Sequence, residues 1–386
     1  MNLSELSNRL DGQAMFQILS RAQELERLGK DLIHFEIGDP DFGTPLNIKN
    51  AACEAIMDGD THYTNSMGLL ELREAAIDVT EKSRGFRPSL DQVLVTPGAN
   101  AQLFYAIACT MNPGDEVIIP DPSFVSYASI IKMLGGIPVR VPLKESNDFR
   151  LDPDDVQKAI TSKTAMIIMN SPSNPTGAVM QPDEIMRVAF LSFKHGIYLL
   201  SDEIYARMIY TDGETTFSSP SIYDKCEQFV IIVNGFSKSY AMTGWRLGVV
   251  TGPSQLIAKM GLMLETTTSC VSPFIQRAGI VALRDEQNAV NSMLNIYRDR
   301  RDLIVEALNN IKGISCREPK GGFYVFPNIT KTGKTSNQVF EALLEAGVVV
   351  APGTIFGEHG EGYIRLCYAN GAENIARAMI RIKDAL

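Results

Sequence analysis

Residues 229–252 read FVIIVNGFSKSYAMTGWRLGVVTG, and two strand-like runs in this stretch enclose a loop of unusual composition. FVIIVN (229–234) and LGVVTG (247–252) are apolar almost throughout, which is typical of strands covered on both faces. In the loop, Lys238 stands between two serines, and Arg246 follows eight positions later. Lysine ordinarily keeps its ammonium group in water, so this setting indicates a loop that brings an amine close to a bound group.

Five further runs of the same kind precede this stretch. They are QVLVT (92–96), EVIIP (116–120), PVRVPL (138–143), AMIIMN (165–170) and IYLLSD (197–202). Helical patterns separate most of them, among them ANAQLFYAIACTM and PDEIMRVAFLSFKHG, the second with a proline near its start and a glycine after its end. This alternation predicts an α/β fold with a mostly parallel, seven-stranded sheet between helices.

The rhythm changes from about Asn288, where a long charged helix is expected, followed by strands near GGFYVFP and GYIRLCYA and a final helix. A chain of 386 residues favours about two domains. We therefore predict a large domain over 48–287 and a smaller α+β domain formed by 1–47 and 288–386. KGGFYVFP (320–327) is predicted to be structural only.

The composition excludes several classes of protein. The formal charge is 36 − 45 = −9, and the basic run RDRRD (298–302) is interrupted by acids, so a nucleic-acid binder is not expected. No uncharged apolar stretch approaches the roughly 18 residues of a membrane span, and the start MNLSELSNRLDGQ has no apolar signal-peptide core. The six cysteines form no C-x-x-C pair, which predicts mostly buried free thiols and a reducing cytoplasm. No metal site is predicted.

Four strand ends carry polar groups, and ligands of open α/β sheets bind beyond the carboxyl ends of the strands. VTPGANAQLF offers the first amides of a helix to an anion, although a plain turn is an alternative. SPSNPTGAV places Asn174 after a strand, where it could also be an ordinary turn residue. LLSDEIYARMIY leaves Asp202 at a strand end, as a ligand or a helix cap. With Lys238 and Arg246, these groups suit one small, anionic, heteroaromatic ligand.

The chain resembles the pyridoxal-phosphate (PLP) enzymes of the aspartate-aminotransferase superfamily, class I/II, fold type I. The resemblance runs from FEIGDPDF to YIRLCYAN and rests on an ordered series of motifs: PGANA, DPSFVSY, NSPSNPTGAV, SDEIYARMIY and NGFSKSYAMTGWRLG. The chain is most similar to the branch that contains archaeal-type aspartate, aromatic and alanine aminotransferases. The resemblance implies ping-pong transfer of an amino group between an L-amino acid and a 2-oxo acid.

The resemblance also implies roles for residues at matching positions. Lys238 is expected to form the Schiff base with PLP and to move the substrate proton, since desolvation and nearby cationic charge favour its neutral amine. Asp202 would pair with the pyridine nitrogen, while Asn174 and Tyr205 would donate to the phenolic oxygen. The remaining cofactor contacts implied are Ser237, Arg246 and the amides of Ala99 and Asn100 at the phosphate, and Phe124 stacked on the ring.

Two further roles concern the substrate and the neighbouring subunit. Arg365 matches the clamp for the substrate α-carboxylate, although an arginine in a strand could also be a surface residue in an ion pair. Gly38 matches backbone that closes over the substrate, and Asn174 is expected to contact it as well. Tyr63 matches a tyrosine that reaches the phosphate from a neighbouring subunit, which predicts a homodimer with a shared active site.

Two other functions use related scaffolds. A carbon–sulfur lyase or an aminocyclopropane-carboxylate synthase would share nearly every cofactor contact, because fold does not decide the reaction. A transcription regulator with an aminotransferase-like domain would carry an additional DNA-binding domain, and only about 30 residues precede IHFEIGD here. The particular residues of the motifs favour amino-group transfer.

The sequence leaves the substrate and the pathway open. Some bacterial aspartate-specific relatives carry a lysine where this chain has Asn100, which puts aspartate specificity in doubt. Candidates for a second carboxylate contact are Arg73, Arg140, Arg277 and Arg284. Candidates for an apolar side-chain pocket are Phe16, Phe124 and Tyr127, which could equally be core residues.

Overall fold

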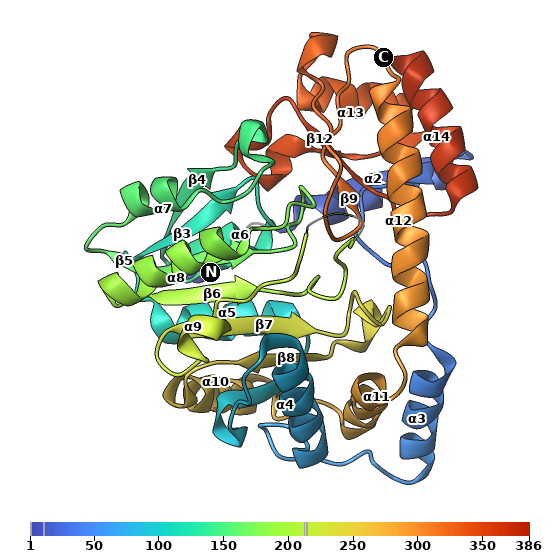
Figure 1. The fold of residues 1–386 in the computed structure, drawn as a ribbon. Helices are drawn as coiled ribbons and strands as arrows, with labels where there is room; N and C mark the ends of the chain where they lie inside the picture. The colour runs from blue at the N-terminus through green and yellow to red at the C-terminus, as the bar shows by residue number, and fades with distance from the viewer. Residues whose placement is uncertain (1, 11, 212, 214) are drawn as a thin grey trace.

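A seven-stranded sheet forms the centre of the molecule (Figure 1). The computed structural model describes residues 2–10, 12–211, 213 and 215–386. In spatial order the strands are β2 (Val93–Thr96), β8 (Gly248–Thr251), β7 (Val230–Gly235), β6 (Tyr198–Asp202), β5 (Thr164–Asn170), β3 (Glu116–Asp121) and β4 (Ile137–Pro142). Neighbours from β7 to β4 are parallel, and β8 is antiparallel to both β7 and β2. The predicted α/β fold and all seven predicted strands are confirmed.

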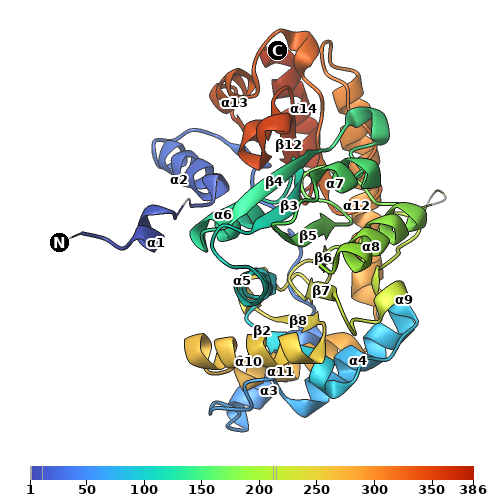
Figure 2. The same ribbon diagram turned by 90° about the vertical axis from the view of Figure 1, so that its left-hand side faces the viewer.

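The central strands are apolar on both faces because each face is covered by its own core. Ile118, Ile167 and Leu199 pack into one core, while their neighbours Val117, Met166 and Leu200 pack into the other. The first core is shared with α7 (Pro153–Ala159) and α8 (Pro182–His195), the second with α5 (Ala99–Thr110), α6 (Ser126–Met133) and α10 (Ser254–Thr268). Figure 2 shows these two sets of helices on opposite sides of the sheet.

Further helices pack near the β2 edge of the sheet. There α11 (Pro273–Arg284) contacts α3 (Leu46–Met57) and α4 (Leu70–Arg84). The short helix α9 (Ser221–Asp224) lies beside β7. Single 3₁₀ turns cover Leu90–Gln92, Glu145–Asn147, Thr243–Trp245, Thr330–Thr332, Gly353–Phe356 and Glu358–Gly360.

A second group of elements lies beyond the carboxyl ends of the parallel strands. Its antiparallel sheet contains β11 (Ala351–Pro352), β12 (Ile364–Cys367) and β9 (Tyr324–Val325), so strands form where GGFYVFP and GYIRLCYA predict them. A parallel pair joins β1 (Ile33–His34) to β10 (Val348–Val349), which ties the N-terminal segment to the C-terminal part. The helices of this group are α1 (Glu5–Asn8), α2 (Ala14–Arg27), α12 (Asn288–Asn309), α13 (Ser336–Glu345) and α14 (Ala372–Ala385).

Three further features are the position of α1, the character of the helices and the state of the cysteines. In Figure 2, α1 stands out from the body of the molecule, on the side of α6. Within the described ranges, no helix combines the length and apolar character needed to cross a membrane. All six cysteines are free, but only Cys226, Cys316 and Cys367 are buried, so the expectation that most are buried is right for half of them.

Candidate active site

The carboxyl ends of the parallel strands bring the predicted polar groups together. In the sheet register Asn170 at the end of β5 lies beside Asp202 at the end of β6, and Asp202 lies beside Val233 of β7. Lys238 follows β7 directly, in the loop that leads to β8. These ends open into a cavity of about 480 Å³, which also receives residues of the N-terminal segment and of β9 and β12.

All the predicted site residues except Tyr63 line this cavity. They are Gly38, Ala99, Asn100, Phe124, Asn174, Asp202, Tyr205, Ser237, Lys238, Arg246 and Arg365. Tyr63 is 88% exposed and belongs to the loop after α3. Tyr63 therefore does not line the cavity of its own chain.

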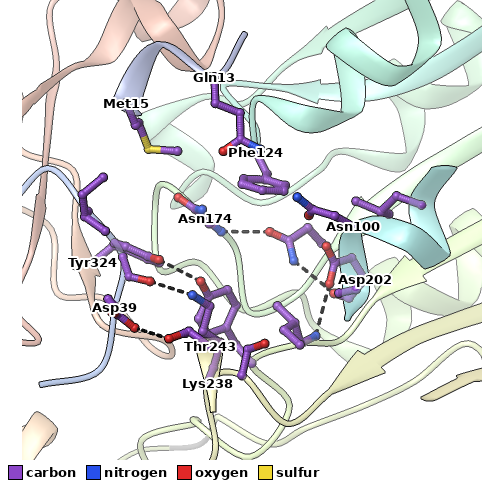
Figure 3. A pocket seen from close by; sticks show the side chains of 18 of the residues that line it. Gln13, Met15, Asp39, Asn100, Phe124, Asn174, Asp202, Lys238, Thr243 and Tyr324 are labelled. Atoms are coloured by element: carbon purple, nitrogen blue, oxygen red, sulfur yellow. Dashed lines mark hydrogen bonds between the residues drawn. The ribbon is translucent and has the colours of Figure 1, made fainter. Parts of the chain in front are cut away.

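Lys238 faces the cavity and hydrogen-bonds across it. Its Nζ donates to the carbonyl of Gly38 at 2.6 Å (Figure 3). The same Nζ lies 5.8 Å from the centre of the Phe323 ring. Burial lowers the pKa of Lys238 to about 8, against the opposing influence of Asp39. An appreciable fraction of the amine is therefore neutral near neutral pH, as a nucleophile or a base requires.

Asp202 is a buried carboxylate held by two donors. The Tyr127 hydroxyl donates to Oδ2 at 2.5 Å, and the Ile204 amide donates to Oδ1 at 3.2 Å. Burial raises the pKa of Asp202 to about 6, although the Tyr127 bond acts in the opposite direction. Asp202 thus makes the local backbone contact that a cap would make, yet its carboxylate lines the cavity as well.

Asn174 is placed by its neighbour Asn170. The Asn170 side chain accepts from the Asn174 amide at 2.8 Å and donates to the Asp202 carbonyl at 3.0 Å. Asn170 itself lines the cavity, although it is absent from the sequence-based candidates. Its position as the last residue of AMIIMN, just before the asparagine-proline turn, is the available signal.

Arg246 and the start of α5 form a strongly positive corner. Gly98 precedes α5 with φ 83°, and a Cβ at this position would lie 2.6 Å from the Arg246 guanidinium. Glycine is therefore needed both for the backbone angle and for the close approach. A guanidinium placed against the positive end of a helix stabilises a bound anion. This geometry favours an anion site at PGANA over the alternative of a plain turn.

Arg365 is completely buried, so the alternative of a surface ion pair is wrong. Its Nη1 donates to Asn174 Oδ1 at 3.2 Å and its Nη2 donates to the Glu36 carbonyl, while its Nε has no partner. The guanidinium lies between the rings of Tyr324 and Phe356, 4.7 and 4.9 Å from their centres. A buried guanidinium with an unused donor is suited to a carboxylate ligand.

Tyr324 belongs to the cavity wall, although no chemical role is predicted for residues 320–327. Its hydroxyl is 2.8 Å from that of Tyr205, and a Cβ on Gly38 would lie 1.9 Å from it. Only glycine at 38 lets the backbone approach this hydroxyl. Tyrosine inside an apolar strand gives no signal for this contact, because Gly38 is 286 residues away in sequence.

The wall opposite Lys238 is mostly uncharged. Gln13, Met15 and Phe16 enter from the start of α2, and Phe124 lies beside them (Figure 3). Gln13 donates to the Ser126 hydroxyl at 2.9 Å. Gln13 and Met15 are absent from the sequence-based candidates, because only the fold brings the N-terminal segment to this wall.

The four arginines considered for a second carboxylate lie outside this cavity. Arg73 donates to the carbonyls of Val93 and Leu90, and Arg277 pairs with Asp60 and Glu71. Arg140 lies 3.5 Å from the buried Asp121, and Arg284 is on α11. Tyr127 is likewise behind the wall rather than part of it.

The residues present fit PLP, by their chemistry and their geometry. The positive corner at Gly98 and Arg246 suits its phosphate, the buried carboxylate of Asp202 suits a protonated ring nitrogen, and the amine of Lys238 suits its aldehyde. The unused Nε of Arg365 remains for the carboxylate of an amino acid.

Comparison with known proteins gives a consistent result. The profile of the family described as "Aminotransferase class I and II" matches residues 30–382. The chain is 45% identical over 373 residues to an aspartate aminotransferase of Pyrococcus horikoshii, covering 96% of this chain and 93% of that one. It is 40% identical over 390 residues to aromatic-amino-acid aminotransferase 2 of Thermococcus litoralis, covering 100% and 98%.

The fold agrees with these relatives. The structure of an aspartate aminotransferase from Thermus thermophilus with maleate superposes with a TM-score of 0.95 at 36% identity, over 100% of both chains. The names of these relatives favour amino-group transfer over the lyase or synthase alternative. The chain belongs to the class I and II aminotransferases of fold type I, and it is a PLP-dependent enzyme that transfers amino groups between amino acids and oxo acids.

Proposed function

We propose that Lys238 is the residue that combines with PLP and moves the substrate proton in this enzyme. The observation that carries the proposal is its amine, directed into the cavity with a lowered pKa and within 2.6 Å of the Gly38 carbonyl. When bound, PLP supplies an aldehyde that combines with amines and a ring that draws electrons from the carbon being deprotonated. We also propose catalytic roles for Asp202 and Tyr205.

The other residues of the cavity would bind and orient. Asp202 would hold the proton on the ring nitrogen, and Asn174 and Tyr205 would donate to the phenolic oxygen. At the phosphate we propose Ser237, Arg246 and the amides of Ala99 and Asn100, which is supported by the approach of Gly98 to Arg246. Phe124 would cover one face of the ring.

Substrate binding is proposed for Arg365, Asn174 and Gly38. Arg365 would hold the α-carboxylate with two parallel hydrogen bonds, and its burial keeps competing water away. The Asn174 side chain, 3.2 Å from Arg365, would orient the guanidinium and contact the substrate. The Gly38 backbone would close over the substrate, and its carbonyl would hold the Lys238 amine only when that amine is not combined with PLP.

We infer that amino acids with aromatic or other apolar side chains are the preferred substrates. Lys238, Arg246 and Arg365 are the cations that line the cavity in the described part of the chain, and each has a proposed role. The remaining wall offers Met15, Phe16 and Ile37, with the amides of Gln13 and Asn100. Aspartate is the second candidate, because relatives are named for it and those amides could bind a distal carboxylate.

The experiment loads the enzyme with PLP, offers single amino acids, and follows conversion to the pyridoxamine form. We expect phenylalanine, tyrosine and leucine to convert at lower concentrations than aspartate or glutamate. Asn100→Lys should shift the preference towards aspartate, because it adds the cation that the wall lacks. Faster conversion with aspartate than with every neutral amino acid would reject the apolar preference and leave the second candidate.

We also propose a homodimer in which Tyr63 completes the neighbour's site. Its support is an exposed apolar region around α3, the following loop and α10, formed by Tyr63, Leu46, Met57 and Leu262, each more than half exposed. Exposed apolar groups in contiguous elements mark interaction surfaces.

Two further proposals concern organisation and location. We propose a large domain over 48–287 and a small domain over 1–47 and 288–386, supported by the β1–β10 pair that unites both parts of the latter. The first boundary falls within the first turn of α3, which begins at Leu46. A cytoplasmic location is supported by the six free cysteines.

A further inference from the structure

Tyr127 contacts two residues of the active site without lining the cavity. It stands in the first turn of α6 and is completely buried. Its hydroxyl donates to Asp202 Oδ2 at 2.5 Å. Its ring meets the Phe124 ring edge to face, with 5.7 Å between the centres and an angle of 83°. One buried side chain thus supports both the carboxylate and the aromatic ring proposed to hold the cofactor ring.

The Tyr127 hydroxyl matters because burial makes the ionisation of Asp202 unfavourable. Burial raises its pKa to about 6, and Glu203 next to it acts in the same direction. The Tyr127 hydroxyl, the Ile204 amide and the charge of Lys238 favour the ionised form, and the Tyr127 bond is the largest of these influences.

The Tyr127 hydroxyl can donate a hydrogen bond to Asp202 throughout the neutral pH range. Burial and the adjacent Asp202 raise its pKa well above the ordinary value for tyrosine. It therefore remains protonated, so its proton points at the carboxylate whenever Asp202 is ionised. The short O–H···O⁻ distance is that of a charge-assisted hydrogen bond.

We propose that Tyr127 is a positioning residue of this aminotransferase: its hydroxyl keeps Asp202 charged and aimed at the cofactor's ring nitrogen, and its ring seats Phe124 against the ring face. The inference rests on the proposed roles of Asp202 and Phe124. Tyr127 acts through these two residues and touches neither cofactor nor substrate. Its role is therefore distinct from those assigned above.

The test measures the affinity of the apoenzyme for PLP as a function of pH. Trp245, the only tryptophan of the chain, reports binding through its fluorescence. The variants are Tyr127→Phe, Asp202→Asn and the control Tyr105→Phe. Tyr105 is also a buried tyrosine, but its hydroxyl bonds to Thr267 behind α5.

We expect wild-type affinity to fall as the pH drops through about 6, because protonation removes the Asp202 charge. Tyr127→Phe should move this midpoint to higher pH by about one unit and weaken binding at pH 7 about tenfold, since it deletes a hydrogen bond to a charged group. Asp202→Asn should lack the fall in PLP affinity around pH 6 that we assign to Asp202. Tyr105→Phe should leave the profile unchanged.

One result would contradict the proposed role of Asp202, and another would contradict only the role proposed for Tyr127. If Asp202→Asn binds PLP like the wild type at every pH, the proposed role of Asp202 is wrong and this inference fails with it. If Asp202→Asn alters the profile but Tyr127→Phe does not, only the inference fails.

The double variant separates positioning from general support of the fold. In the Asp202→Asn background, adding Tyr127→Phe should leave the pH profile unchanged and cause less than a twofold further loss of affinity. An equal loss in both backgrounds would show that Tyr127 does not act through Asp202, and the inference would be overturned.

Discussion

At the scale of single residues, the chemistry depends on how far water is excluded from charged groups. Burial penalises the charged forms of Lys238 and Asp202, which lowers the pKa of Lys238 to about 8 and raises that of Asp202 to about 6. The two groups therefore titrate close to neutral pH, where small changes in their surroundings alter their charge. This is the range in which acid–base catalysis is most effective.

Lys238→Ala should abolish amino-group transfer while the protein still folds. The variant removes the amine that we propose combines with PLP and moves the proton, so turnover should fall by at least about a thousandfold. Amino-acid-dependent oxo-acid formation measures this. Lys259→Ala, on the exposed face of α10, is the control and should keep full activity. Wild-type turnover in Lys238→Ala would refute the assignment.

Arg365→Leu should raise KM for amino acids while PLP binding stays normal. A lost bidentate contact to a carboxylate costs about 2–3 kcal/mol, which corresponds to roughly a hundredfold in KM. Leucine still packs between the Tyr324 and Phe356 rings, so the fold should persist. The control is Arg377→Leu, which removes only an exposed ion pair with Asp31. A KM within twofold of wild type would place the α-carboxylate elsewhere.

At the scale of elements, β1 carries a histidine, His34, that pairs with carboxylates of α2 and of the segment just after β1. His34 Nδ1 bonds to Glu36 at 2.8 Å and its Nε2 bonds to Glu26 at 3.0 Å. Glu36 is fully buried, and its carbonyl accepts from Arg365. The bond to Glu36, supported by Glu26, raises the pKa of His34 to about 9, so the imidazole is protonated at neutral pH.

This pair predicts a loss of stability at alkaline pH. The folded protein holds the His34 proton more tightly than the unfolded chain, so the stabilisation is complete below pH 6.5 and disappears as the pH rises to about 9. Allowing for partial exposure, the free energy of unfolding should drop by about 1–2 kcal/mol across this window.

Denaturant unfolding of wild type and His34→Gln from pH 6.5 to 9 measures the effect as a difference. Lys238 has a lowered pKa and contributes stability that rises with pH above about 8, but it is present in both proteins and cancels. An identical pH dependence in the two proteins would show that His34 contributes nothing.

At the scale of the whole molecule, the question is whether each site needs two chains. Tyr63→Asp should repel the phosphate if Tyr63 serves a neighbour's site, and Arg365→Leu disables the site of its own chain. In a mixed dimer of these chains, one site collects both lesions and the other is intact. We expect activity to reappear on mixing, towards one active site per mixed dimer.

Mixing Arg365→Leu chains with Lys238→Ala chains is the control and should restore nothing, because each site keeps one lesion. Subunit exchange is verified with differently tagged chains. If exchange occurs and the Tyr63→Asp mixture stays inactive, Tyr63 does not complete the neighbour's site.

Local patterns in the chain are sufficient to predict the sheet and the residues at its carboxyl edge. Runs such as EVIIP and AMIIMN are apolar throughout because both faces of each strand are covered, and this signal is local. Asn174, Asp202 and Lys238 follow such runs directly, so parallel pairing was enough to predict that they meet. The resemblance to the superfamily then suggested what each could do.

The distant segments that complete the cavity are set by packing that no local pattern predicts. Tyr324 and Gly38 approach so closely that a Cβ would not fit, and Gln13 reaches the wall opposite Lys238, although nothing local marks these positions. Tyr127 could be taken for a pocket wall or core, and its bond to Asp202 is set by how α6 packs on the sheet. Such contacts depend on packing between elements far apart in sequence, and periodicity carries no information about them.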